Sequence, residues 1–159
     1  PLPAAAGLRL APAPHGATCR RMTVLAAIAL ICTAMLFGGM AFFAACVAPV
    51  VFTRLPPEWA GRFIRGLFPI YYLWVLGTAA AAAFALLPLR PLDGLALAAL
   101  AGVTVWLRQS LMPRINALSD AAQAGDASAK AGFDRAHRLS VQVNVAQMVV
   151  ALGVLARFA

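Results

Sequence analysis

The fold is decided by residues 22–53, MTVLAAIALICTAMLFGGMAFFAACVAPVVFT, which carry no charged side chain. About 20 helical residues cross the hydrocarbon core of a bilayer, so this run can span a membrane even if Pro49 kinks its end. Its start resembles a secretory signal peptide, because Arg20 and Arg21 precede an apolar segment. The run is far longer than the roughly 7–15 apolar residues of such a signal, and we predict a retained transmembrane helix.

The composition extends this prediction to the whole chain. Of its 159 residues, 63% are hydrophobic and 11% are charged, whereas soluble domains average roughly 45–50% and 25%. A soluble fold of this size could not bury so much apolar surface, so lipid must cover the remainder. The formal net charge of +8 comes from basic residues that flank apolar runs, which suits contact with anionic headgroups. Nucleic-acid binding is not expected as the main role, because no polar surface is large enough for a basic patch with stacking aromatics.

Three further apolar runs predict an all-α integral membrane four-helix bundle. We expect a flexible Pro/Ala-rich tail over residues 1–21 and a transmembrane domain over 22–159, with spans at about 22–52, 67–87, 92–112 and 137–157. The turn Pro88–Asp93 makes a hairpin of spans two and three. Pro113 is predicted to end the third span, and residues 114–136 to form a polar loop. Within that loop, Asp126 or Ser128 can cap a helix that runs into the fourth span.

A short amphipathic helix is expected between the first two spans, lying at the membrane surface. Trp59, Phe63 and Leu67 recur every four residues, while Arg62 and Arg65 fall off that line. Aromatic residues also gather at the start of the second span, as they do at membrane interfaces. The expected interfacial anchors are Trp59, Arg62, Arg65, Tyr71, Tyr72 and Trp74.

Small residues and basic residues predict helix packing and orientation. Gly38, Gly39, Gly77 and Ala81 lie in apolar helices, where small side chains let a neighbouring backbone approach closely. The first and third loops hold more Lys and Arg than the termini and the second loop together. The positive-inside rule therefore favours both termini outside.

The fourth span carries the most informative polar pattern. His137, Ser140, Asn144 and Gln147 follow the helical repeat and share one face. Polar side chains at membrane depth avoid lipid, so we expect this stripe to point into the bundle. Two interpretations stay open. The stripe can hold helices together by hydrogen bonds, which is favoured, or it can line a small polar cleft reached by Arg108.

We predict no metal site, no cofactor and no catalytic function. Cys32, Met35 and Cys46 fall on roughly one face and could bind a soft metal such as Cu(I), but Met and Cys are also ordinary packing residues. His137 is the one candidate axial ligand for a haem within the membrane. The sequence contains no zinc-ligand spacing, phosphate-binding glycine loop, carboxylate pair or nucleophile motif.

Several segments occur in an order that is typical of one known family. They are Phe37-Gly38-Gly39, Pro49-Val50-Val51-Phe52, Leu67-Phe68-Pro69-Ile70-Tyr71-Tyr72, Met112-Pro113-Arg114-Ile115-Asn116, and Phe133 with His137, Ser140 and Asn144. From about Met22 onwards the chain resembles the family of small four-span proteins named for transmembrane protein 205, a group of unknown function common in bacteria. The proline-rich N-terminal extension departs from that family.

The resemblance implies a four-helix domain in the bacterial cytoplasmic membrane, and it supplies no reaction. Members of the family have been discussed in terms of resistance to toxic compounds, which would fit transport. The positions that the resemblance marks for testing are Arg108, Pro113, Asn116, His137, Ser140 and Asn144.

Two functions follow as expectations. The leading one is a non-catalytic membrane protein that acts by association, as an accessory or scaffolding subunit of a larger membrane assembly or as a self-associating bundle. Its partners would be the bilayer and other membrane subunits or itself, with no nucleic acid. The alternative is a small transporter or permeation protein for a small or toxic solute. Its candidate residues are Arg108, Asn116, His137, Ser140, Asn144 and Gln147.

Overall fold

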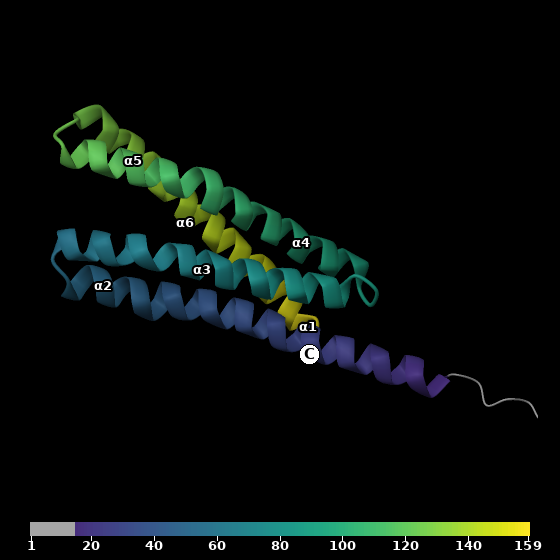
Figure 1. Ribbon diagram of the computed structural model, residues 1–159. Helices are drawn as coiled ribbons and strands as arrows, with labels where there is room; N and C mark the ends of the chain where they lie inside the picture. The colour runs from purple at the N-terminus through teal and green to yellow at the C-terminus, as the bar shows by residue number, and fades with distance from the viewer. Residues whose placement is uncertain (1–14) are drawn as a thin grey trace, which may run out of the picture.

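The computed structural model describes residues 15–159, which form a bundle of four long helices (Figure 1). The four apolar stretches Arg20–Arg54, Pro57–Leu86, Pro91–Gln123 and Ala127–Ala156 are long and apolar enough to cross a membrane. Successive helices run antiparallel and are joined by short turns. The predicted all-α membrane bundle is confirmed. Residues 1–14, which make up most of the expected tail, lie outside the described residues.

Two of the four long helices contain a widened, π-helical turn. The first long helix consists of α1 (His15–Phe42), η1 (Phe43–Val47) and α2 (Ala48–Arg54), and the second is α3 (Pro57–Leu86). The third consists of α4 (Pro91–Trp106), η2 (Leu107–Leu111) and α5 (Met112–Gln123), and the fourth is α6 (Ala127–Ala156).

Both widened turns lie just before a proline, Pro49 in α2 and Pro113 in α5. A proline has no amide hydrogen, and its ring clashes with the carbonyl four residues earlier in a regular helix. A π-turn shifts that carbonyl aside. The amide of Met112 accordingly bonds to the carbonyl of Leu107, five residues back. Pro113 therefore does not end the third helix, contrary to the sequence prediction.

The expected polar loop 114–136 is also helical. α5 continues to Gln123, and α6 begins at Ala127 after a tight turn. Gly125 has a φ of +99°, a conformation that other residues rarely adopt, and this lets the chain reverse within three residues. Asp126 caps α6 by accepting hydrogen bonds from the amides of Ser128 and Ala129, which confirms one of the two predicted caps.

Two other boundaries differ from the prediction. The expected interfacial helix is not a separate element, because α3 runs without a break from Pro57 into the second span. Pro56 caps that helix and Pro57 is its first residue. The helix does not break at Pro69, which lies in its interior. At the N-terminal side, α1 begins at His15, so part of the segment expected as a flexible tail is helical.

The interior of the bundle is built around α3. This helix packs against α1 on one side and α4 on the other, and α6 closes the bundle against α1 and α4. α3 and α6 therefore occupy opposite corners. Many of the buried residues of α3 are alanines, at positions 79, 82, 83 and 85. Their small side chains let the neighbouring helices approach closely.

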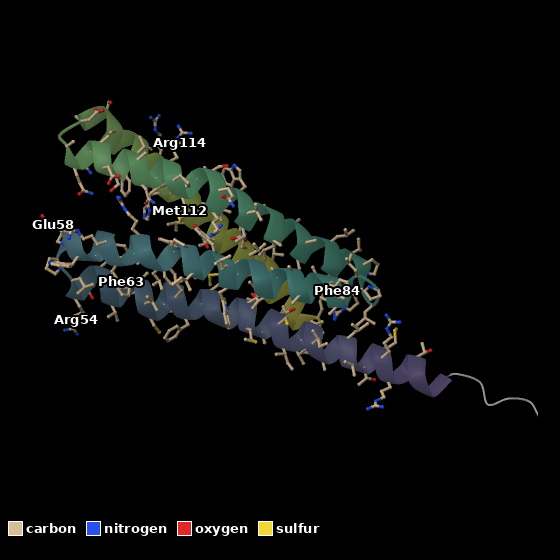
Figure 2. All side chains as sticks on the ribbon, in the orientation of Figure 1. Arg54, Glu58, Phe63, Phe84, Met112 and Arg114 are labelled. Atoms are coloured by element: carbon tan, nitrogen blue, oxygen red, sulfur yellow. The ribbon has the colours of Figure 1, made fainter. Side chains whose placement is uncertain are left out.

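Charged residues gather at the two ends of the bundle. One end, which we call the hairpin end, holds the α2–α3 and α5–α6 turns. Figure 2 shows Arg54 and Glu58 at this end. The opposite end holds the α3–α4 turn and the C-terminal end of α6. Between the two ends the outer surface is apolar, as at Phe84, whose side chain is 77% exposed. This distribution matches two headgroup layers around a hydrocarbon slab.

Candidate functional site

Gln147 forms a buried polar contact between helices. Its amide nitrogen donates to the hydroxyl oxygen of Thr104 at 2.9 Å and to the carbonyl of Leu100 at 3.1 Å, so it ties α6 to α4. The Thr104 hydroxyl donates to the same carbonyl at 2.9 Å. The side chains of Gln147 and Thr104 are buried. The Oε1 atom of Gln147 is also buried, and it has no hydrogen-bond partner within residues 15–159.

Asn144 links α6 to the helix at the opposite corner. The hydroxyl of Tyr71 on α3 donates to Asn144 Oδ1 at 3.1 Å, and the Asn144 amide nitrogen donates to the carbonyl of Ser140 at 2.8 Å. Tyr71 belongs to an aromatic cluster with Tyr72, Phe43 and Phe68. The cluster anchors the tyrosine ring against η1, so its hydroxyl reaches across the bundle.

Toward the hairpin end, the predicted polar stripe passes from the interior of the bundle to its surface. Ser140 is buried, and its hydroxyl donates to the carbonyl of His137 in its own helix at 2.8 Å. The His137 ring is exposed and lies parallel to Phe133, with the ring centroids 5.7 Å apart. Ser140, Asn144 and Gln147 therefore point inward as predicted, whereas His137 lies at the surface.

Arg108 and Asn116 lie on the third long helix, both partly buried. Arg108 is in η2, one turn beyond Thr104, and its Nε atom is buried without a hydrogen-bond partner among the described residues. Asn116 lies further toward the hairpin end, in α5. A buried guanidinium nitrogen without a partner is costly in an apolar bundle, and Arg108 shares this incomplete pairing with Gln147.

The small residues occupy two different environments. Gly39 packs against Trp74, and an added Cβ would lie 2.6 Å from the indole Nε1. Gly38, Gly77 and Ala81 are exposed on the outside of the bundle, and a Cβ at either glycine would meet no atom within 4 Å. Gly39 therefore makes a close contact with a neighbouring helix, whereas Gly38 and Gly77 do not within the described residues.

The predicted interfacial anchors also divide between surface and interior. Trp59 is exposed with the Arg62 guanidinium 5.5 Å from its ring, and Arg65 pairs with Asp120 of α5 at 2.8 Å, all at the hairpin end. Tyr71 and Tyr72 instead lie inside the bundle. Trp74 is exposed on its outside, and its indole N–H donates to the carbonyl of Met35 at 3.4 Å.

An ion-pair cluster around Asp93 was not anticipated from the sequence. Asp93, only 5% exposed, pairs with Arg90 Nε at 3.0 Å and with Arg157 Nη1 at 2.9 Å. Arg90 also donates to the Arg157 carbonyl at 2.7 Å and lies over the ring of Phe158. The cluster joins the α3–α4 turn to the end of α6. The spacing of Arg90 and Asp93 was the available signal, although it gave no reason to expect Arg157.

Within the described part of the chain, no group of three or more His, Cys, Asp or Glu side chains comes close enough to hold a metal ion. Cys32 is partly buried and Cys46 is exposed. The side chain of Cys19 lies outside the description.

Comparison with known proteins places the chain in a family. A family model described as a domain of unknown function, DUF4149, matches residues 31–124, from the middle of α1 past the end of α5. A search of curated proteins gave no match. A search of solved structures also gave none.

Proposed function

The chain belongs to the DUF4149 family, a domain of unknown function, and we propose that it is non-catalytic and acts by association. It would be an accessory or scaffolding subunit of a larger assembly, or a self-associating bundle. The observation that best supports this proposal is the contrast between the two sides of α3. The inner side is packed closely on buried alanines, whereas the outer side exposes Gly77 and Ala81 between the large side chains of Leu73 and Phe84. Such a recess suits docking of another transmembrane helix.

The test is native mass spectrometry of the protein extracted from its own membrane in mild detergent. A co-purifying chain in fixed ratio, or a homo-oligomer, is the expected result. Gly77→Leu should fill the recess and release the partner. Gly102→Leu on α4 is the matched control, because Gly102 is also an exposed helical glycine with no atom within 4 Å of an added Cβ. A lone monomer under all mild conditions would refute the proposal.

A second candidate function is transport or permeation of a small or toxic solute. Two observations favour it, the buried Arg108 Nε and Gln147 Oε1, both without partners in residues 15–159. The resemblance to the transmembrane protein 205 family also supports transport. The same resemblance supports a location in the bacterial cytoplasmic membrane. Asn144→Leu and Arg108→Gln should each remove a resistance or flux phenotype while the protein still folds. The control is His137→Ala, because that ring lies at the surface. Unchanged flux in the first two variants would exclude this candidate.

A further inference from the structure

The hairpin end carries an open pocket between the third and fourth long helices. Its volume is about 350 Å³. The lining residues are Leu111, Arg114, Gly132, Arg135, Ala136 and Leu139. We propose that this pocket binds the phosphate group of an anionic membrane lipid. The inference is independent of the function proposed above.

The two arginines of the pocket are available to a ligand. Arg114 comes from α5 and Arg135 from α6, and both are exposed. Neither forms an ion pair or a side-chain hydrogen bond within residues 15–159, whereas the nearby Arg65 and Lys130 pair with Asp120 and Asp134. No acidic residue lines the pocket. Two unpaired guanidinium groups from neighbouring helices can hold one phosphate between them.

The pocket is amphipathic along the membrane normal. Each arginine has an apolar lining residue one turn away on its own helix. Leu111 precedes Arg114 on the third long helix, and Leu139 follows Arg135 on α6. On both helices the leucine lies closer to the middle of the bundle than the arginine does. Leu139 is itself exposed and begins the charge-free run of α6. A lipid has the same order, with a phosphate above and acyl chains below, whereas free phosphate would use only the arginines.

The position of the pocket on the bundle supports a lipid. Figure 2 shows Arg114 on the outer side of α5, away from α3, while Met112 lies on the other side of the helix. Arg114 therefore points away from the bundle interior, toward the side where lipid would surround the protein. The hairpin end is also the end that the positive-inside rule assigns to the cytoplasm. Anionic lipids are concentrated in that leaflet, where basic pockets between transmembrane helices bind their headgroups.

The experiment counts lipids that remain bound to the full chain by native mass spectrometry. The protein is placed in nanodiscs of phosphatidylcholine with a minority of phosphatidylglycerol. It is then released from the nanodiscs in the mass spectrometer, and the lipids that stay bound to it are identified. We expect preferential retention of one phosphatidylglycerol. The Arg114→Ala/Arg135→Ala variant should weaken it about 25-fold, because each arginine–headgroup contact contributes roughly fivefold. Thermal unfolding should stay unchanged, since neither arginine has a partner in the described fold.

The matched control is Arg54→Ala/Arg62→Ala, which removes the same charge from the same end but leaves the pocket intact. It should retain the lipid. Equal losses in the two double variants would overturn the proposal, because the attraction would then come from net charge alone. Displacement of the lipid by millimolar inorganic phosphate would also overturn it and assign the pocket to a soluble phosphate. Equal retention of both lipids would exclude a headgroup site.

Discussion

At the scale of single residues, Gly39 sets how closely α1 approaches α3. An added Cβ would lie 2.6 Å from the Trp74 indole nitrogen, closer than real side chains approach. Gly39→Ala should therefore displace the indole and lower the free energy of unfolding by about 1 kcal/mol, at the low end for overpacking because Trp74 can move outward. Thermal unfolding in detergent measures the loss, and a shift in tryptophan emission reports the displaced ring.

The adjacent glycine provides the control for this substitution. Gly38→Ala introduces a Cβ with no atom within 4 Å. It should leave the stability unchanged or raise it slightly, because alanine favours the helix more than glycine does. Equal destabilisation by the two substitutions would mean that the contact with Trp74 is unimportant.

The polar stripe illustrates what residue spacing can predict. Ser140, Asn144 and Gln147 were expected to face the interior, and they do, because lipid excludes unpaired polar groups from the outer face. Their partners were not predictable. The Tyr71 hydroxyl and the Leu100 carbonyl come from helices whose rotation depends on the packing of the whole bundle. His137 lies near the end of the span, where the requirement to face inward no longer holds.

At the scale of elements, the cap of α6 should make the α5–α6 hairpin sensitive to pH. The hydroxyl of Ser128 and the amides of Ala129 and Ser128 donate to the Asp126 carboxylate, and they lower its pKa below its usual value. The stabilisation is thus present above the unfolded pKa and is lost as pH falls through the folded pKa. Hydrogen exchange of the Ser128 and Ala129 amides, corrected for intrinsic rate, should speed up on acidification.

Two substitutions separate capping from charge in this element. Asp126→Asn should keep the cap but abolish its pH dependence, because asparagine caps helices about as well as aspartate without titrating. Asp134→Ala should change little, since its contact with Lys130 is 3.8 Å long and both side chains are exposed. Acid-induced exchange that persists in Asp126→Asn would point to another group.

The helices themselves show where sequence patterns succeed and fail. Apolar length identified all four spans, because only helices satisfy their backbone groups in lipid. Boundaries based on proline failed at Pro113, since a widened turn removes the clash on which the rule depends. The polar segment 114–136 was expected as a loop because it is charged. Charge predicts departure from the membrane but does not prevent a helix.

At the scale of the whole molecule, the Asp93 cluster holds the C-terminal end of α6 against the α3–α4 turn. Asp93→Asn should lower the free energy of unfolding by about 1–2 kcal/mol. Removing one partner of a fully buried ion pair costs roughly 3–5 kcal/mol, but here Arg90 is 27% exposed and Arg157 60%. Chemical unfolding in detergent, with protease cleavage near residue 157 as a local readout, measures the effect.

Asp120→Asn is the comparison at the other end of the bundle. It removes the Arg65–Asp120 pair, whose side chains are 39% and 61% exposed, and should cost less than about 1 kcal/mol. If Asp93→Asn proves equally mild, the cluster does not close the bundle.

The three prolines inside the spans have a consequence for the electric field across the protein. Pro49, Pro69 and Pro113 all lie in the half of the bundle toward the hairpin end, and each deprives the carbonyl four residues earlier of its usual amide donor. Carbonyls that lose their donor at membrane depth need a substitute donor, from a neighbouring helix, a Ser or Thr side chain, or water. Where water is the substitute, it enters further from this end, and a membrane voltage falls mainly across the drier half that contains Gln147.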